Sequence, residues 1–175
     1  MSAMSASRPE TPAVDGPAWR RAMGAFTSGV TIVASADGGQ VSATTVSAFS
    51  SLSLDPPLLL ACLDRDSRTL AMIRRSGVFS VNILAAHQGP LAMLCAARGT
   101  VNRLADAAWR EGGASGAPLL DGAAAHIECR LQQAVDGGDH VILIGEGLAV
   151  EVDPEAEPLV YRHGRLHWRL GEPGA

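Results

Sequence analysis

The apolar residues near the start of the chain follow a helical period. Trp19, Met23 and Phe26 are spaced at i, i+4 and i+7, and Pro17 stands where the first turn of a helix tolerates proline. A short amphipathic helix is therefore predicted. From Ser28 the pattern changes to the β-branched run SGVTIVAS, which predicts a strand, and the letters DGG soon after it predict a hairpin turn.

Most of the following runs also have the composition or period of strands. A stretch rich in small and hydroxyl side chains, VSATTVSAFSSLSL, is broken by DPP at residues 55–57 and continues as the apolar strand LLLACL. Ser67 is a candidate N-cap for a helix that ends at Gly77, and VFSVNIL returns to strand. A second helical pattern covers residues 91–98, and a loose polar segment that includes Trp109 follows it.

The last third of the chain predicts two more hairpins. Apolar and polar residues alternate from Ile127, the turn letters DGG follow, and VILIGEGLAVEV is the opposite strand. The runs LVYR and RLHWR flank a turn at His163-Gly164. Strands outnumber helices and are joined by hairpins rather than by long crossovers. The pattern therefore predicts a mainly β fold, an antiparallel barrel with helices packed outside it.

Composition limits the class of protein. The 175 residues are near the usual size of one domain, and 47% hydrophobic with 18% charged residues is too apolar for a disordered chain. No apolar run reaches the roughly 20 residues that cross a bilayer. A formal net charge of -4 with scattered basic residues argues against nucleic-acid or membrane partners. Residues 1–16, rich in Ser, Ala and Pro, predict a flexible arm before a domain at residues 17–170.

The cysteines indicate a compartment. Cys62, Cys95 and Cys129 are odd in number and form no CxxC pair, and no basic-then-apolar leader opens the sequence. A disulfide framework is therefore not expected. A reducing, cytoplasmic location is expected instead.

The sequence lacks the usual glycine-rich phosphate-binding motifs, so a nucleotide would have to be bound by another segment. Residues 43–53 could provide it, because small residues let backbone N–H groups approach a flat ligand and hydroxyls can bond its oxygens; a solvated strand has the same composition. In DRDS, Ser67 with Arg65 or Arg68 could bind a phosphate at a helix start, or Ser67 could only cap the helix.

His140 stands where a Gly-Gly-Asp turn enters an apolar strand. It could bond a nicotinamide carboxamide or exchange a proton there, or it could be a turn histidine paired with Asp139. His163 and His167 have no carboxylate or cysteine at a supporting spacing, so no metal site is expected. The absence of a GxSxG elbow argues against a hydrolytic triad.

In this order the segments resemble the short-chain flavin reductases of the FMN-binding split-barrel family, the reductase components of two-component flavin-dependent monooxygenases. The landmarks are SGVTIVAS, TTVSAFSSLSLDPPLLLACLDRDS, GVFSVNIL, GGDHVILIGEG and LVYRHGRLHW, which lie within residues 19–168. The resemblance implies a six-stranded antiparallel split barrel that forms a homodimer, with the flavin in a groove near the subunit interface.

The same resemblance implies a set of site residues. His140 would be the catalytic residue, on the nicotinamide side. Ala43 and Ser47 stand where the family often has Gly and Asn, and only Arg98 or Arg103 matches a basic residue often found after the second helix. The implied cofactor-binding residues are Thr45, Val46, Ser47, Ala48 and Phe49 against the isoalloxazine, Ser51, Arg65, Asp66 and Ser67 toward the ribityl and phosphate groups, and Cys62, Asn82, His140 and Tyr161 around the same cleft.

The implied activity is NAD(P)H-dependent reduction of flavin. Hydride would pass from NADH or NADPH to FMN or FAD, and the reduced flavin would leave for a separate monooxygenase. The protein would align the two rings, and His140 would orient the carboxamide or relay a proton. The alternative is a non-catalytic flavin-binding or electron-transfer split barrel. A flavin-free interaction module is a third interpretation.

Overall fold

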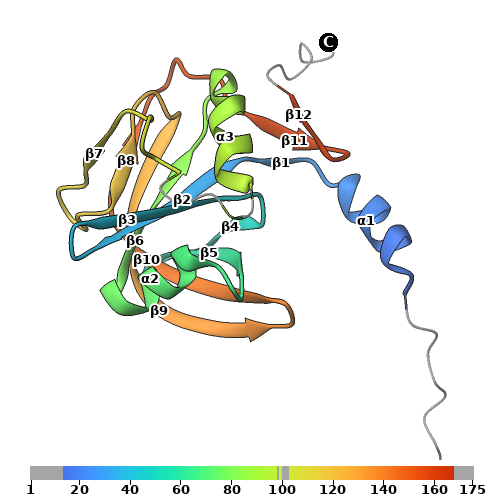
Figure 1. The fold of residues 1–175 in the computed structure, drawn as a ribbon, viewed down its shortest axis with the longest axis horizontal. Coiled ribbons are helices and arrows are strands. Elements are labelled where there is room, and N and C mark those ends of the chain that lie inside the picture. The colour runs from blue at the N-terminus through green and yellow to red at the C-terminus, as the bar shows by residue number, and fades with distance from the viewer. Residues whose placement is uncertain (1–13, 98, 100–102, 168–175) are drawn as a thin grey trace, which may run out of the picture.

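The computed structural model describes residues 14–97, 99 and 103–167. Every strand pair of its main sheet is antiparallel, and Figure 1 labels the strands. The strand order is β3 (Gln40–Val46), β2 (Thr31–Asp37), β6 (Val78–Ile83), β9 (Ala125–Gly137), β10 (His140–Val152), β5 (Pro57–Asp64) and β4 (Phe49–Leu54). The predicted mainly β, antiparallel fold is therefore confirmed. The sheet has seven strands rather than six, because the hydroxyl-rich run of β4 pairs with β5 and adds an edge strand.

Two small sheets and the helices complete the described part of the chain. The elements are α1 (Gly16–Gly24), α2 (Arg68–Ser76), α3 (Gly89–Ala96), a single 3-10 turn η1 (Ala86–Gln88), a sheet of β1 (Ser28–Gly29), β11 (Val160–Arg162) and β12 (Arg165–His167), and a hairpin of β7 (Trp109–Glu111) and β8 (Pro118–Leu120). The β7–β8 hairpin is a correction, because Trp109 was expected in a loose segment. Arg98, one of the two basic candidates after the second helix, lies outside the described residues.

The predicted signals at both ends of α2 are confirmed. Ser67 is the N-cap, and its side chain accepts a hydrogen bond from the N–H of Leu70. Gly77 ends the helix in the left-handed conformation, with φ 73°. The helix buries Leu70 and Ile73 in the barrel core, beside Phe79. This packing fixes the start of α2 at the end of β5.

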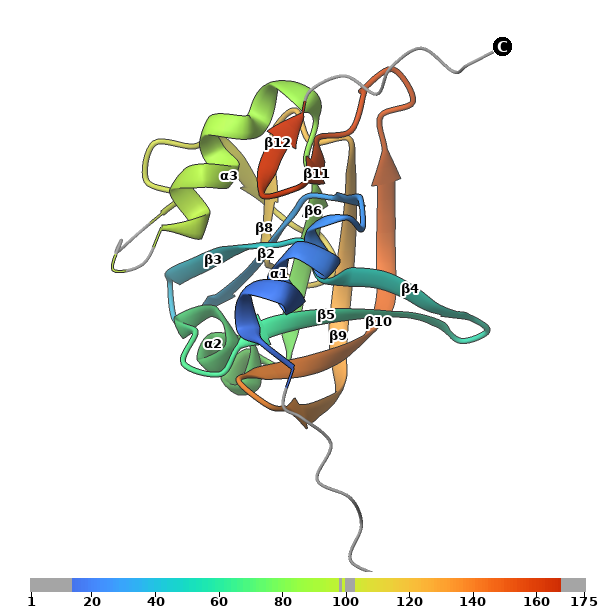
Figure 2. The ribbon, with the colours of Figure 1, turned by 90° about the vertical axis from the view of Figure 1, so that its right-hand side faces the viewer.

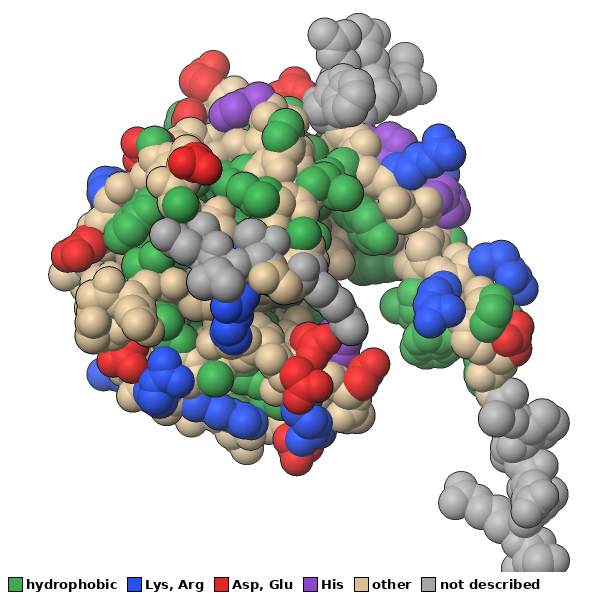
Figure 3. Space-filling model, viewed as in Figure 1, with side chains coloured by type: hydrophobic (Ala, Val, Ile, Leu, Met, Phe, Trp, Pro, Cys, Tyr) green, Lys and Arg blue, Asp and Glu red, His purple; other side chains and the backbone are tan. Residues whose placement is uncertain are grey.

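Helix α1 is attached differently. It begins at Gly16, after an Asp15 N-cap, and ends at Gly24, so that Phe26 lies beyond the predicted helical face. None of its residues is buried. Figures 1 and 2 show α1 standing away from the sheet and in front of β5, and Figure 3 shows hydrophobic side chains on its side toward the body. The predicted arm at residues 1–16 lies almost wholly outside the described residues.

Candidate active site

A cavity of about 580 Å³ opens beside the end of β3 and the start of α2. We name it the hydroxyl cleft, because threonine and serine side chains line it together with apolar ones. The lining residues are Thr44, Thr45, Val46, Cys62, Leu63, Asp64, Asp66, Ser67, Arg68, Ala96, Gly99, Arg103 and His140. Six of the predicted cofactor-binding residues are thus brought together: Thr45, Val46, Cys62, Asp66, Ser67 and His140.

The start of α2 borders this cleft, next to the carboxylates of Asp64 and Asp66. Asp64 Oδ1 accepts the N–H of Asp66 at 2.9 Å, which shapes the turn before the helix, and Ser67 then caps the first turn. The first N–H groups of a helix carry a partial positive charge and bind phosphates well. Arg68 lines the cleft beside them. Ser67 caps the helix and also lines the cleft, so its interpretation as a cap and its interpretation as part of an anion site are compatible.

The Gly-Asp-His turn presents His140 beside the loop that precedes α2. His140 begins β10, pairs in register with Asp64, and lines the cleft. Its Nδ1 lies 2.8 Å from Asp139 Oδ1, so Nδ1 must donate, because an ionised carboxylate only accepts. This hydrogen bond, followed by the charge of His140, lowers the pKa of Asp139. In the neutral ring Nε2 is then an acceptor, suited to the N–H of a carboxamide.

Arg65 does not line the cleft, although it was expected to face the ribityl and phosphate groups of the flavin. Its Nε and Nη2 donate to the carbonyl of Gly138 at 3.3 and 2.9 Å, and its Nη1 lies 3.2 Å from Asp136 Oδ1. Arg65 therefore braces the β9–β10 turn that carries His140, and it is not among the residues that line the cleft. Arg68, which the sequence left as an equal candidate, takes the place beside Ser67.

Asn82 also departs from its expected place. Its side chain is fully buried in the middle of the sheet. The amide donates to the carbonyls of Ile32 and Pro118, at 3.2 and 3.3 Å, and its oxygen accepts the N–H of Leu120 at 2.8 Å. These bonds tie β6 to β2 and β8, so the side chain of Asn82 stabilises the fold and is not offered to a ligand.

A second and larger hollow, of about 1060 Å³, lies between α1 and the edge of the barrel. We name it the aromatic groove. It is lined by Trp19, Arg20, Arg21, Met23, Gly24, Phe26, Ser28, Ser47, Ala48, Phe49, Leu60, Cys62, Tyr161, His163 and Gly164. The predicted residues Ser47, Ala48, Phe49 and Tyr161 are therefore here. Ser51 lies next to them on β4, exposed, and lines neither hollow.

Cys62 joins the two hollows, because it lines both. Its N–H donates to the carbonyl of Ala48 at 2.9 Å, which holds the β3–β4 connection against β5. Burial raises the pKa of the Cys62 thiol. Burial also raises the pKa of Cys95 to about 11 and of Cys129 to about 12, and all three cysteines are free. Cys62 is thus a protonated, half-buried side chain at the junction of the hollows.

Arg103 is the residue that the sequence identified least well. It lies in a turn after α3, yet its Nη1 donates to the carbonyl of Ala43 at 3.0 Å and its Nη2 to that of Ala97 at 2.7 Å. These bonds bring the guanidinium to the edge of β3, where it lines the hydroxyl cleft. The resemblance matched a basic residue after the second helix only to Arg98 or Arg103, and a basic residue in a polar segment predicts no position in space.

The described residues contain neither a metal-binding cluster nor a membrane-spanning helix. No group of three or more His, Cys, Asp and Glu side chains there is arranged to hold a metal ion. Within the same residues, no helix has the length and apolar character needed to cross a membrane.

The two hollows together suit a flat ring that carries a phosphorylated chain. Thr45 and Ser67 offer hydroxyls, and the start of α2 points its first N–H groups toward the same cleft. The aromatic groove adds room for rings beside Cys62.

Comparison with known proteins gives consistent matches. The model of a family described as "Flavin reductase like domain" matches residues 23–169. The reductase subunit of a flavin-dependent monooxygenase from Rhodococcus jostii is 37% identical over 155 residues, which is 87% of this chain and 77% of that protein. A flavin reductase (NADH) from Kitasatospora aureofaciens is 39% identical over 163 residues, or 91% of this chain and 85% of that one.

Solved structures agree with these matches. An NADH:FAD oxidoreductase from Streptomyces globisporus, in complex with NAD and FAD fragments, has a TM-score of 0.86 at 32% identity, covering 91% of this chain and 96% of that one. Component B of a nitrilotriacetate monooxygenase from Mycobacterium thermoresistibile has a TM-score of 0.82 at 35% identity, covering 86% and 84%.

Proposed function

The chain belongs to the flavin reductase-like domain family and is an NADH-dependent flavin reductase, and we propose that its flavin and nicotinamide meet where the hydroxyl cleft joins the aromatic groove. The reaction supplies reduced flavin to the oxygenase of a two-component monooxygenase. One observation carries the proposed site: Cys62 lines both hollows, while Ser67 at the start of α2 and His140 line the same cleft.

The flavin lies with its phosphate at the start of α2. Ser67 and Arg68 are placed to hold that phosphate, and Thr45 and Val46 lie along the path from it toward Cys62. The isoalloxazine then reaches the aromatic groove, beside Ala48. Bound flavin, FMN or FAD, supplies the hydride acceptor, so the protein needs no nucleophile of its own. Its task is to align two rings and to exclude water from their contact.

His140 is the residue proposed to act on the nicotinamide side. Asp139 fixes the proton on Nδ1, which leaves Nε2 to accept a hydrogen bond from the carboxamide of NADH or NADPH. The brace from Arg65 holds the turn that presents this ring. His140 therefore orients the hydride donor, and its removal should slow the reaction without abolishing it.

We propose that the working form is a homodimer. Trp19, Met23 and Phe26 are 58%, 50% and 72% exposed, and all three line the aromatic groove. Monomeric proteins rarely leave such a continuous apolar surface open to water. A second copy of the chain would cover α1 by a two-fold contact and would enclose the ring end of the flavin.

The test of the activity is direct. Purified protein is mixed with NADH and either FMN or FAD, and the loss of the nicotinamide absorbance band is followed, with NADPH in a parallel series. Turnover of NADH that depends on both protein and flavin is the expected result. Tight flavin binding without NADH oxidation would instead support the non-catalytic flavin carrier. A coupled assay with a flavin-dependent monooxygenase and its substrate then tests the supply of reduced flavin.

A further inference from the structure

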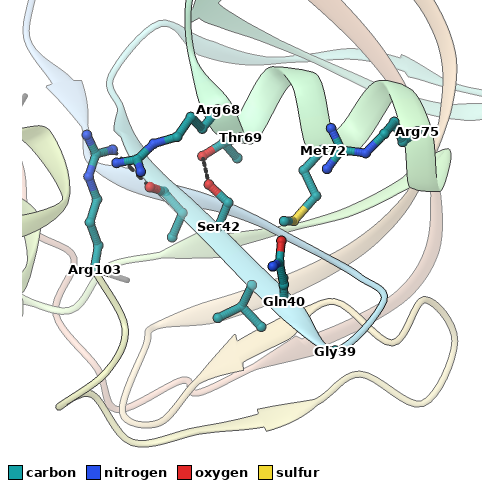
Figure 4. Close-up of a pocket in the computed structure, with 10 residues that line it drawn as sticks. Gly39, Gln40, Ser42, Arg68, Thr69, Met72, Arg75 and Arg103 are labelled. Carbon is teal, nitrogen blue, oxygen red and sulfur yellow. Dashed lines mark hydrogen bonds between the residues drawn. The ribbon is translucent and has the colours of Figure 1, made fainter. Parts of the chain in front are cut away.

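A third cavity adjoins the hydroxyl cleft on the side away from the aromatic groove. Its volume is about 470 Å³, with β3 on one side, Thr69, Met72 and Arg75 of α2 on the other, and Arg68 and Arg103 at one end (Figure 4). We name it the arginine pocket. Arg68 and Arg103 line the hydroxyl cleft as well, so the two cavities meet at a pair of guanidinium groups.

The arginine pocket carries excess positive charge. Three arginines line it and, in the part of the chain that the structure describes, no carboxylate does. Arg75 is paired with Asp37 at 3.0 Å, whereas no ion pair among the described residues includes Arg103. The Nε of Arg103 is buried without a hydrogen-bond partner. Figure 3 also shows basic side chains gathered over α2. Two guanidinium groups at one junction favour an anion between them.

The rest of the pocket is neutral and part of it is apolar. The hydroxyls of Ser42 and Thr69 bond to each other at 2.9 Å across the gap between β3 and α2. The thioether of Met72, only 5% exposed, extends from α2 toward Gln40, as Figure 4 shows. Thioether groups adapt well to the face or edge of an aromatic ring. The pocket thus combines a pair of guanidinium groups with neutral and apolar walls.

We propose that the arginine pocket binds the adenylate half of FAD, so that this chain prefers FAD to FMN. The inference rests on the proposed flavin site, in which the flavin phosphate lies at the start of α2. FAD is FMN extended through that phosphate by a second phosphate, a ribose and an adenine. Because Arg68 borders both cavities, a chain that continues past Ser67 enters the arginine pocket with its second phosphate between Arg68 and Arg103.

The experiment uses residues that line the arginine pocket but not the hydroxyl cleft. Arg75→Gln removes one cation, and Gln40→Glu adds a carboxylate on the opposite wall. Arg74→Gln is the matched control, because Arg74 is the exposed neighbour on the same helix and lines none of the three cavities. Dissociation constants for FAD and FMN are measured by fluorescence titration, and melting temperatures check the fold of each variant.

Wild-type protein should bind FAD about tenfold more tightly than FMN. Arg75→Gln and Gln40→Glu should each weaken FAD about three- to tenfold and leave FMN unchanged, and Arg74→Gln should change neither. Equal affinity of the wild type for both flavins, or equal loss of both in the variants, would overturn the inference. So would a raised KM for NADPH with unchanged FAD affinity, since the pocket would then serve the 2′-phosphate of NADPH. Failure of the wild type to bind any flavin would instead overturn the proposed function itself.

Discussion

The hydroxyl cleft and the aromatic groove meet at Cys62, but they are built in opposite ways. The walls of the cleft are core strands and the capped start of α2, whose Leu70 and Ile73 are buried in the barrel. The outer wall of the groove is α1, which buries none of its own residues. The end of the site proposed to hold the phosphate is therefore complete within one chain, whereas the end proposed to hold the rings is open.

Because of this difference, we expect flavin affinity and catalytic turnover to depend on different parts of the site. Phosphate binding at a fixed helix start needs no rearrangement, so flavin affinity should depend mainly on the cleft. Ring alignment needs a wall that water cannot enter, and α1 alone does not supply it. Damage to the groove should thus reduce turnover most, and damage to the cleft should reduce flavin affinity most.

The largest effect on oligomeric state and turnover is expected from placing charge on the apolar wall of the aromatic groove. The double variant Met23→Glu, Phe26→Glu places two carboxylates on the apolar wall of the groove, in and just after α1, so it should convert the proposed dimer to a monomer and lower kcat by about tenfold or more. Light scattering and steady-state turnover measure the two effects. Ala22→Glu is the matched control, because Ala22 is exposed on α1 but does not line the groove. An active monomer at micromolar concentration would disprove the link between dimer and catalysis.

The next effect concerns the phosphate end. Ser67→Asp keeps an N-cap but places a carboxylate at the proposed phosphate position, so flavin affinity should fall by about ten- to a hundredfold while the melting temperature stays nearly constant. Ser67→Asn, which caps without charge, should bind flavin far better than the Asp variant. Isothermal titration with FMN measures both. Unchanged affinity in Ser67→Asp would place the phosphate elsewhere.

A smaller effect is expected at His140. Loss of one ordinary hydrogen bond is worth about 0.5–1.5 kcal/mol, so His140→Ala should raise the KM for NADH or lower kcat several-fold. Flavin affinity should stay nearly the same. Asp139→Asn should give a weaker version of this defect, because it loosens the tautomer without removing the ring. A variant that loses flavin but keeps its NADH kinetics in excess flavin would show that His140 contacts the flavin.

The last prediction concerns the chemical reactivity of the Cys62 thiol, which lies where the two hollows meet. Burial raises the pKa of the Cys62 thiol, so the reactive thiolate forms only as the pH rises toward that value. Labelling by iodoacetamide should therefore be slow at neutral pH and accelerate about tenfold per pH unit below the pKa. Cys95 and Cys129, with pKa values of about 11 and 12, should stay unlabelled in the folded protein. Bound flavin should protect Cys62, and mass spectrometry of the labelled peptides measures this; equal labelling with and without flavin would contradict the proposed ring position.

Local signals in the sequence were enough to predict much of the fold. The cap at Ser67, the stop at Gly77 and the turn before His140 depend on neighbouring residues alone, and each lies where its pattern predicted. The longer hydroxyl-rich run forms parts of β3 and β4, and several of its residues line the two hollows, because its composition suits both a strand and a ligand wall.

The errors share one physical cause, which is that a polar side chain can bond to distant parts of the chain. Asn82 was expected near the flavin, but its bonds to β2 and β8 involve residues 36 to 50 positions away. Arg65 bonds to a turn 73 positions away. Arg103 reaches Ala43 across 60 positions. No local pattern contains such partners, so their roles required the structure.

The Arg65 brace has a consequence for protein engineering. It joins the DRDS loop, which precedes α2, to the turn that carries His140, and Arg65 also donates its own N–H to the carbonyl of Asp139 at 3.0 Å. Loop and turn therefore behave as one exchangeable module. A chimera that takes only one of them from a relative would leave a guanidinium without its matched turn and would misalign the imidazole. Both segments should be transplanted together.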